Sequence, residues 1–250
     1  MSSCPAESFL YTIQSGDSLW QIAQRFHITI PEIMSLNPKI DINNLYIGQT
    51  LCIPQEYTPY KTPWQPAPLC INKAEQTLSN HMRMLWEQHV YWTRLLILSM
   101  ALELPNTDLV ANRLLRNPKD FEAALKPLYG KDLAAKFSEL FTSHLTIAAE
   151  LVKAAKAGDS TAAADAEKRW YTNATQIATF LGNINPYWST QAWQKMLYDH
   201  LAMTKSEAVY FLTQKYSDTI NVFEKIEQQA LVMADMMTQG IVKQFPEYFV

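Results

Sequence analysis

Five prolines lie within residues 53–69, IPQEYTPYKTPWQPAPL, and they constrain how this chain can fold more than any other feature. Proline lacks a backbone hydrogen-bond donor and disfavours the helical conformation at the residue before it. Residues 55–69 are therefore predicted to form a stiff, extended linker. The sequence before the linker has strand and helix signals, whereas the sequence after it has almost no strand signal. We predict two domains, residues 1–54 and residues 70–250.

The composition is that of a folded protein and excludes two classes of partner. Apolar residues make up 48% of the 250 residues and charged residues 18%, so a sizeable core is expected. The net charge of −3 gives no electrostatic reason to expect binding to nucleic acid. No apolar run of about 18 residues occurs, so membrane insertion is not expected. The first residues lack the basic and apolar regions of a secretory signal peptide, which predicts synthesis in the cytoplasm with an unclear route of export.

The first domain has the predicted order strand, helix, helix, strand. A strand at residues 10–14 leads directly into a helix, for which Asp17 or Ser15 is the expected N-cap. A second helix has Thr29 as its expected N-cap, and a closing strand covers residues 50–53.

This order, together with the stretches YTIQSGDSLWQIAQRF, NP and LYIGQTLCIP, resembles a LysM domain over residues 9–54. The resemblance implies binding of N-acetylglucosamine polymers, meaning peptidoglycan or chitin. It also implies a groove between the loop after the first strand and the loop before the last strand. Carried onto this sequence, the groove residues are Gly16, Asp17, Ser18, Leu19, Ile40, Asp41, Asn44 and Leu45.

The chemistry of such a groove suits an N-acetyl group, which offers one carbonyl and one methyl. Backbone amides at the start of a helix and a shallow apolar floor would contact these two groups. A purely structural role is the alternative, with Asp17 only a helix cap and Leu19 only a core residue.

The cysteines of this domain allow two states. Cys4 and Cys52 flank the first and last strands, which pair in the LysM fold. A disulfide between them would stabilise a domain that is too small to bury a large core. Two free thiols are the alternative.

The second domain is predicted to be an up-down antiparallel helical bundle, which makes the fold class mainly α. The expected helices cover residues 71–104, 106–128, 132–157, 160–182 and 190–244. Breaks are expected inside the second of these at Asn117–Pro118 and at Pro127. The last is expected to be one helix or two, because Thr204 to Glu207 has the form of a capping box.

Polar residues on the apolar stripes are the candidate site of the bundle. His89, His144 and His200 lie on three different predicted helices, and counting from the helix ends places them and Asn173 within about one helical turn of the same height. Glu207 is an additional candidate carboxylate. Such a layer could bind a divalent transition metal, form a hydrogen-bonded core network or line a small-molecule pocket. The absence of a Glu-x-x-His pair counts against a di-iron site.

Residues 82–246 also resemble an uncharacterised bacterial family of helical-bundle proteins. The resemblance includes the stretches LWEQHVYWTR, RLLRNPKDF and HLAMTKSEA. It implies a bundle and no particular chemistry.

We expect a non-enzymatic protein that binds cell-wall glycan, since the sequence has no phosphate loop, no G-x-S-x-G and no H-E-x-x-H. The form of the LysM stretch and the lack of a signal peptide suggest a bacterial cell wall or spore envelope. One alternative is a LysM-targeted metal-binding or enzymatic bundle. Another is a self-assembling component of a surface layer or filament.

Overall fold

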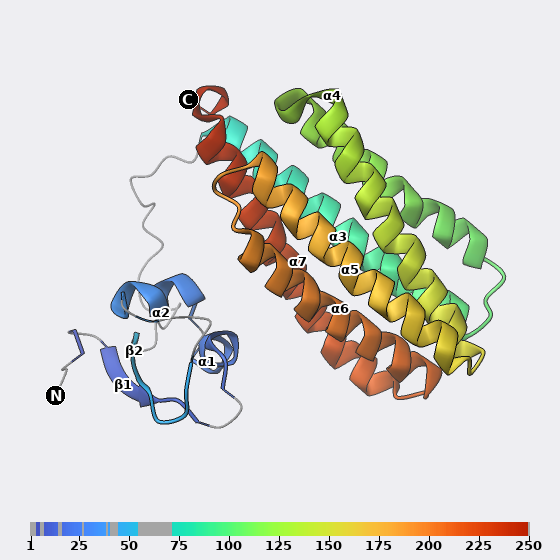
Figure 1. Ribbon diagram of the computed structural model, residues 1–250, viewed down its shortest axis with the longest axis horizontal. Helices are drawn as coiled ribbons and strands as arrows, with labels where there is room; N and C mark the ends of the chain where they lie inside the picture. The colour runs from blue at the N-terminus through green and yellow to red at the C-terminus, as the bar shows by residue number, and fades with distance from the viewer. Residues whose placement is uncertain are drawn as a thin grey trace. The chain divides into compact units, whose positions relative to one another are not determined.

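The computed structural model describes residues 4–5, 8–14, 17–26, 28–38, 40, 45–54 and 72–249 (Figure 1). The chain divides into two compact units, residues 1–69 and residues 70–250. The predicted linker, residues 55–69, lies outside the described residues, so its extended conformation stays a prediction.

The N-terminal unit has the order strand, helix, helix, strand. The elements are β1 (Ser8–Thr12), α1 (Leu19–Arg25), α2 (Ile30–Leu36) and β2 (Thr50–Pro54). The two strands pair antiparallel, with Leu10 opposite Cys52. One apolar cluster fills the space between strands and helices, and its buried members are Ile13, Leu19, Ile22, Ala23, Ile28, Ile33, Leu51 and Ile53.

The caps of the two short helices differ in how well they were predicted. Thr29 caps α2 through a capping box with Glu32, as predicted. The prediction that Asp17 caps α1 is wrong. The Ser18 hydroxyl accepts from the Gln21 amide at 3.2 Å, and the Gln21 side chain accepts from the Ser18 amide at 2.9 Å. Ser18 and Gln21 therefore form the capping box of α1, and Ser15 lies outside the described residues.

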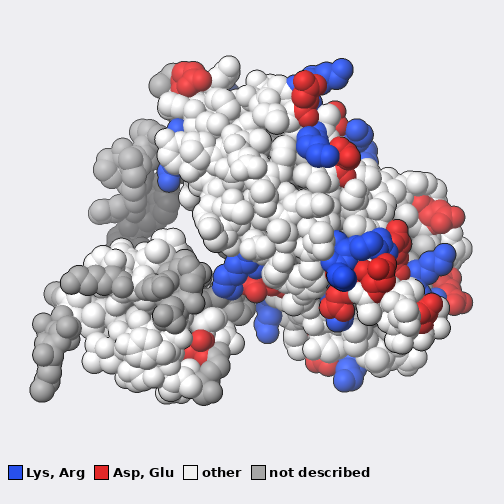
Figure 2. Space-filling view, viewed as in Figure 1, with Lys and Arg blue, Asp and Glu red and all other residues white. Residues whose placement is uncertain are grey.

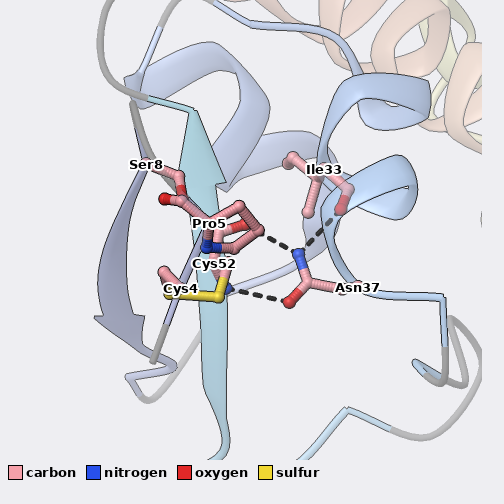
Figure 3. The surroundings of a disulfide bond; sticks show 6 residues. All are labelled: Cys4, Pro5, Ser8, Ile33, Asn37 and Cys52. Atoms are coloured by element: carbon pink, nitrogen blue, oxygen red, sulfur yellow. Dashed lines mark hydrogen bonds between the residues drawn. A yellow bond between two sulfur atoms is a disulfide. The ribbon is translucent and has the colours of Figure 1, made fainter. Parts of the chain in front are cut away.

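Cys52 links β2 to other parts of the N-terminal unit by a disulfide and by hydrogen bonds (Figure 3). A disulfide joins it to Cys4. The Asn37 side chain accepts from the Cys52 amide at 2.8 Å and donates to the Cys52 carbonyl at 2.7 Å. Asn37 also donates to the Ile33 carbonyl at 2.7 Å, which holds it at the end of α2. The Asn37 amide thus pairs with the free edge of β2 as a neighbouring strand would.

The C-terminal unit is an up-down helical bundle, which confirms the mainly α fold class. Its elements are α3 (Lys73–Ala101), α4 (Thr107–Lys156), α5 (Ser160–Ile184), α6 (Thr190–Leu212), α7 (Tyr216–Gln244) and a short 3₁₀ turn at Pro246–Tyr248. Helices that follow one another in the chain pack together, and α3 also packs against α6 and α7. The bundle is thereby closed around a common core (Figure 1).

Two predicted helix breaks in α4 are wrong. The helix continues through Pro118 and Pro127, and it folds back only at Gly130, where φ is +79° (Figure 1). Asn117 is fully buried, and its side chain donates to the Leu85 carbonyl of α3 at 3.0 Å. Packing against α3 therefore stabilises the helix across the residue pair that was predicted to end it.

The last predicted helical stretch, residues 190–244, forms two helices, α6 and α7. The break between them does not lie at Thr204. Thr204 and Glu207 are buried inside α6, which ends at Leu212. Gln214 has a φ of +60°, and the Lys215 amide donates to the Tyr210 carbonyl at 2.8 Å. This is the Schellman arrangement, built here on a residue that carries a Cβ.

We predict that Gln214→Gly stabilises the bundle by about 1 kcal/mol, since glycine adopts a positive φ without the Cβ clash that glutamine has. The measurement is the free energy of unfolding in denaturant. Gln214→Ala is the matched control and should give no such gain, because alanine keeps the Cβ. A glycine variant no more stable than the alanine variant would contradict the prediction.

Candidate functional site

The two loops of the predicted glycan groove lie side by side. The Ile13 amide, just after β1, donates to the Gln49 carbonyl at 2.8 Å, and the Gly48 amide donates back to the Ile13 carbonyl at 2.9 Å. The loop before β2 is therefore fixed against the loop after β1. Three predicted groove residues, Gly16, Asp41 and Asn44, lie outside the described residues.

Asp17 is held by its own domain. Its carboxylate accepts from the Tyr11 hydroxyl at 2.5 Å, from the Gln14 amide at 2.9 Å and from Arg25 at 3.0 Å. Burial opposes ionisation, but these three donors outweigh it and hold the pKa of Asp17 below its usual range. The side chain is only 3% exposed. Asp17 thus positions the loop after β1 and presents little surface to a ligand.

The other described groove residues are also partly used by the fold. Leu19 is buried in the core, and Ile40 and Leu45 are partly buried against it. Ser18 is occupied by the capping box of α1. Ile40 and Leu45 can therefore form part of an apolar floor, whereas Leu19 belongs to the buried core.

Two exposed apolar residues that the groove prediction missed occupy the turn before β2. Tyr46 is 63% exposed and Ile47 is 68% exposed. The Gln49 amide donates to the Tyr46 carbonyl at 3.1 Å, and Gly48 has a φ of +87°, as a type II turn requires at its third position. The signal in the sequence was the pair of large apolar residues directly before a turn glycine.

The bundle surface has mixed charge. Lys and Arg are interspersed with Asp and Glu on the face shown in Figure 2. Among the described residues, no helix has the length and apolar character needed to span a membrane.

The structure brings the three predicted histidines together in the bundle core. The ring centroids of His89 and His200 are 5.6 Å apart, and those of His89 and His144 are 6.4 Å apart. All three side chains are at most 3% exposed. His144 Nδ1 lies 3.0 Å from the side-chain oxygen of Asn173, whose amide donates to the Leu140 carbonyl. We call these four residues the histidine layer.

Aromatic rings surround the histidine layer. The rings of Trp86 and Phe141 lie 5.8 Å and 4.8 Å from the His89 ring, and the Trp170 ring lies 5.4 Å from the His144 ring. Nδ1 of His89 and Nδ1 of His200 are buried without a hydrogen-bond partner. The histidine layer is therefore a set of polar side chains in an apolar environment, and two of its ring nitrogens lack a hydrogen-bond partner.

Burial keeps the three imidazoles neutral. It lowers the pKa of His144 to about 3, with His200 adding to the shift and Asn173 opposing it. It lowers the pKa of His200 to about 4, against the effect of Gln229. The pKa of His89 also lies well below its usual range, first because of burial and then because of the other two histidines.

Glu207 takes part in a different interaction. Arg94 donates to its carboxylate and to the Thr219 carbonyl. Burial raises the pKa of Glu207 to about 7, although Arg94 acts to lower it. Glu207 lies seven residues beyond His200 on α6, or about 10 Å along the helix axis. The structure therefore assigns Glu207 to a buried ion pair and not to the histidine layer.

Metal binding by the histidine layer stays a prediction. Neutral imidazoles are suitable ligands for transition metals. In the described part of the chain, however, no group of three or more His, Cys, Asp or Glu side chains is arranged to hold an ion.

The fold of the N-terminal unit defines its class as a small disulfide-bonded βααβ module with two adjacent loops at one end of its sheet. Residues 11–54 match the LysM domain family, which confirms the resemblance seen in the sequence. The chain therefore carries a LysM domain.

Two relatives match about a fifth of this chain. A secreted LysM effector, Blys4, from Beauveria bassiana is 38% identical over 50 residues, which are 20% of this chain and 29% of the fungal protein. An uncharacterised protein, YkzQ, from Bacillus subtilis is 39% identical over 49 residues, which are 20% of this chain and 64% of that protein. The match thus spans less than two thirds of either relative. No solved structure matches the chain.

We predict that the bundle loses stability as the pH falls from 6.5 towards 4. The three histidines have lower pKa values when folded than when unfolded, so the unfolded state binds more protons in this range. The pKa of Glu207 is raised in the folded state, so the folded state holds one proton there that the unfolded state lacks. The unfolded state therefore binds about two more protons than the folded state. The expected slope of the unfolding free energy is about 2–3 kcal/mol per pH unit.

Denaturant unfolding of the full chain at several pH values measures this slope. His144→Gln should reduce it by about 1.4 kcal/mol per pH unit. The control is His81→Gln, at an exposed position on the same helix as His89, which should leave it unchanged. A stability that stays flat between pH 6.5 and pH 5 would rule out buried neutral histidines.

A second prediction distinguishes a metal site from a core network. If the layer binds a divalent ion, added zinc should raise the melting temperature of the chain by mass action. His144→Ala should abolish the response, and His81→Ala should keep it. If zinc leaves the melting temperature unchanged and the isolated protein carries no metal, the histidines form a core network only.

Proposed function

We propose that this chain binds an N-acetylglucosamine-containing glycan, peptidoglycan or chitin, through its LysM domain and thereby attaches the helical bundle to a cell wall. The observation that carries the proposal is the match of residues 11–54 to the LysM family, on a βααβ fold whose two groove loops lie together.

The exposed turn before β2 supports a binding surface at this end of the domain. Tyr46 and Ile47 present large apolar side chains to solvent, and Ile40 and Leu45 lie partly buried nearby in the sequence. Sugar rings have apolar faces of C–H groups that pack against such side chains, while backbone groups of the loops provide hydrogen bonds to the acetamido carbonyl.

One relative supports a place at or outside the cell surface. The relative from Beauveria bassiana is a secreted LysM effector. A location in a spore envelope, self-association and a metal-binding or enzymatic role for the bundle stay predictions.

We predict that the full chain sediments with insoluble peptidoglycan or chitin, with an affinity between about micromolar and millimolar, or roughly −8 to −4 kcal/mol. Tyr46→Ser should weaken binding by about tenfold, or about 1.4 kcal/mol. Tyr187→Ser is the matched control, because Tyr187 is also exposed, at 54%, but belongs to the bundle. Residues 70–250 alone should not sediment, and binding carried by this fragment would contradict the proposal.

A further inference from the structure

The apolar core of the bundle contains a cavity of about 260 Å³ among α3, α4, α5 and α6. Members of three separate clusters of buried side chains line it: Trp170 belongs to the main cluster, Leu145 to a second and Val152 to a third. Protein interiors contain few voids larger than a water molecule. A cavity of this size is therefore unusual and is large enough to hold a small ligand.

Small side chains on three helices leave this space. Alanines of α4, α5 and α6 face one another across the cavity, where longer side chains would fill it. These alanines are Ala148, Ala149, Ala155, Ala163, Ala164 and Ala208. An apolar cavity of about 150 Å³ accommodates benzene, which scales to roughly ten non-hydrogen atoms here.

The cavity is long and narrow, and it follows the helix axes. Its lining extends over residues 145–155 of α4, 160–170 of α5 and 204–212 of α6. At 1.5 Å per residue these stretches are about 12–15 Å long, which gives the cavity a mean cross-section of about 20 Å². That is about the width of a single alkyl chain. Ten non-hydrogen atoms therefore fit this space in a line and not in a compact ring system.

One end of the cavity is closed and the other end reaches the surface. Leu145 and Trp170 line the closed end and are each 3% exposed. Ala155 and Ser160, on either side of the turn between α4 and α5, are exposed, and so is Val209 near the end of α6. A chain-like ligand would therefore enter beside the α4–α5 turn and leave its polar end there in solvent.

The polar groups of the lining do not provide partners for a polar ligand. Glu167 of α5 and Lys205 of α6 form an ion pair with each other at 2.6 Å. The Thr93 hydroxyl donates to the His89 carbonyl at 2.7 Å. Oγ1 of Thr204 is buried and does not face the space. Removal of apolar surface from water is therefore the interaction that would hold a ligand here.

From the volume, the shape and the apolar lining of this cavity we propose that the bundle binds a single unbranched alkyl chain of about ten carbons, carried by a single-chain amphiphile such as a medium-chain alcohol. The methyl end of the chain lies near Trp170, and the polar end lies at the α4–α5 turn. This site belongs to the bundle alone and does not depend on glycan binding.

A series of alcohols tests the proposal on the full chain by calorimetry. From 1-hexanol to 1-decanol the affinity should rise about fourfold for each added CH₂, because each one leaves water. From 1-decanol to 1-dodecanol it should rise little, because the additional carbons extend into solvent. Cyclododecanol, whose ring is wider than the cavity, should bind at least about tenfold more weakly than 1-decanol.

Variants of the cavity locate the binding. Ala208→Leu and Ala163→Leu should fill the space and weaken binding of 1-decanol at least about tenfold, with folding checked by the melting temperature. Ala162→Leu, at an exposed position of α5 outside the cavity, is the control and should bind as the wild type does. An affinity that keeps rising to 1-dodecanol, equal binding of cyclododecanol, no binding of 1-decanol, or full binding by a folded cavity-filling variant would overturn the proposal.

Discussion

The bundle depends on keeping three imidazoles uncharged in its core. His89, His144 and His200 come from α3, α4 and α6, and they meet among aromatic rings that offer no counter-charge. Protonation of any one would place a charge in an apolar core, which is why burial lowers all three pKa values. The packed bundle is therefore expected to be most stable in the pH range where these rings are neutral.

The N-terminal unit is stabilised by a different means. Its core is one small apolar cluster, and such a core contributes limited stability. Bonds to a single residue of β2 compensate: Cys52 is joined to Cys4 by a disulfide and to the Asn37 side chain through both of its backbone polar groups. These links keep β2 in register, and the register fixes the turn at Tyr46–Gln49 beside the loop that follows β1.

The proposed glycan surface and the bundle cavity differ in construction. The glycan surface consists of exposed apolar side chains on a short turn, which suits a long polymer that approaches from solvent. The bundle cavity is lined mainly by apolar side chains of α3, α4, α5 and α6, several of them alanines.

The sequence alone determined the features that depend on local patterns. The proline-rich segment, the βααβ order, the Thr29 cap and the shared height of the three histidines all follow from spacing and turn chemistry, since these act over a few residues. Tertiary packing decided the rest. It carried α4 through Pro118, moved the end of α6 to Leu212 and paired Glu207 with Arg94. It also left the cavity open, because contacts between residues far apart in the chain outweigh local preferences of about 1–3 kcal/mol.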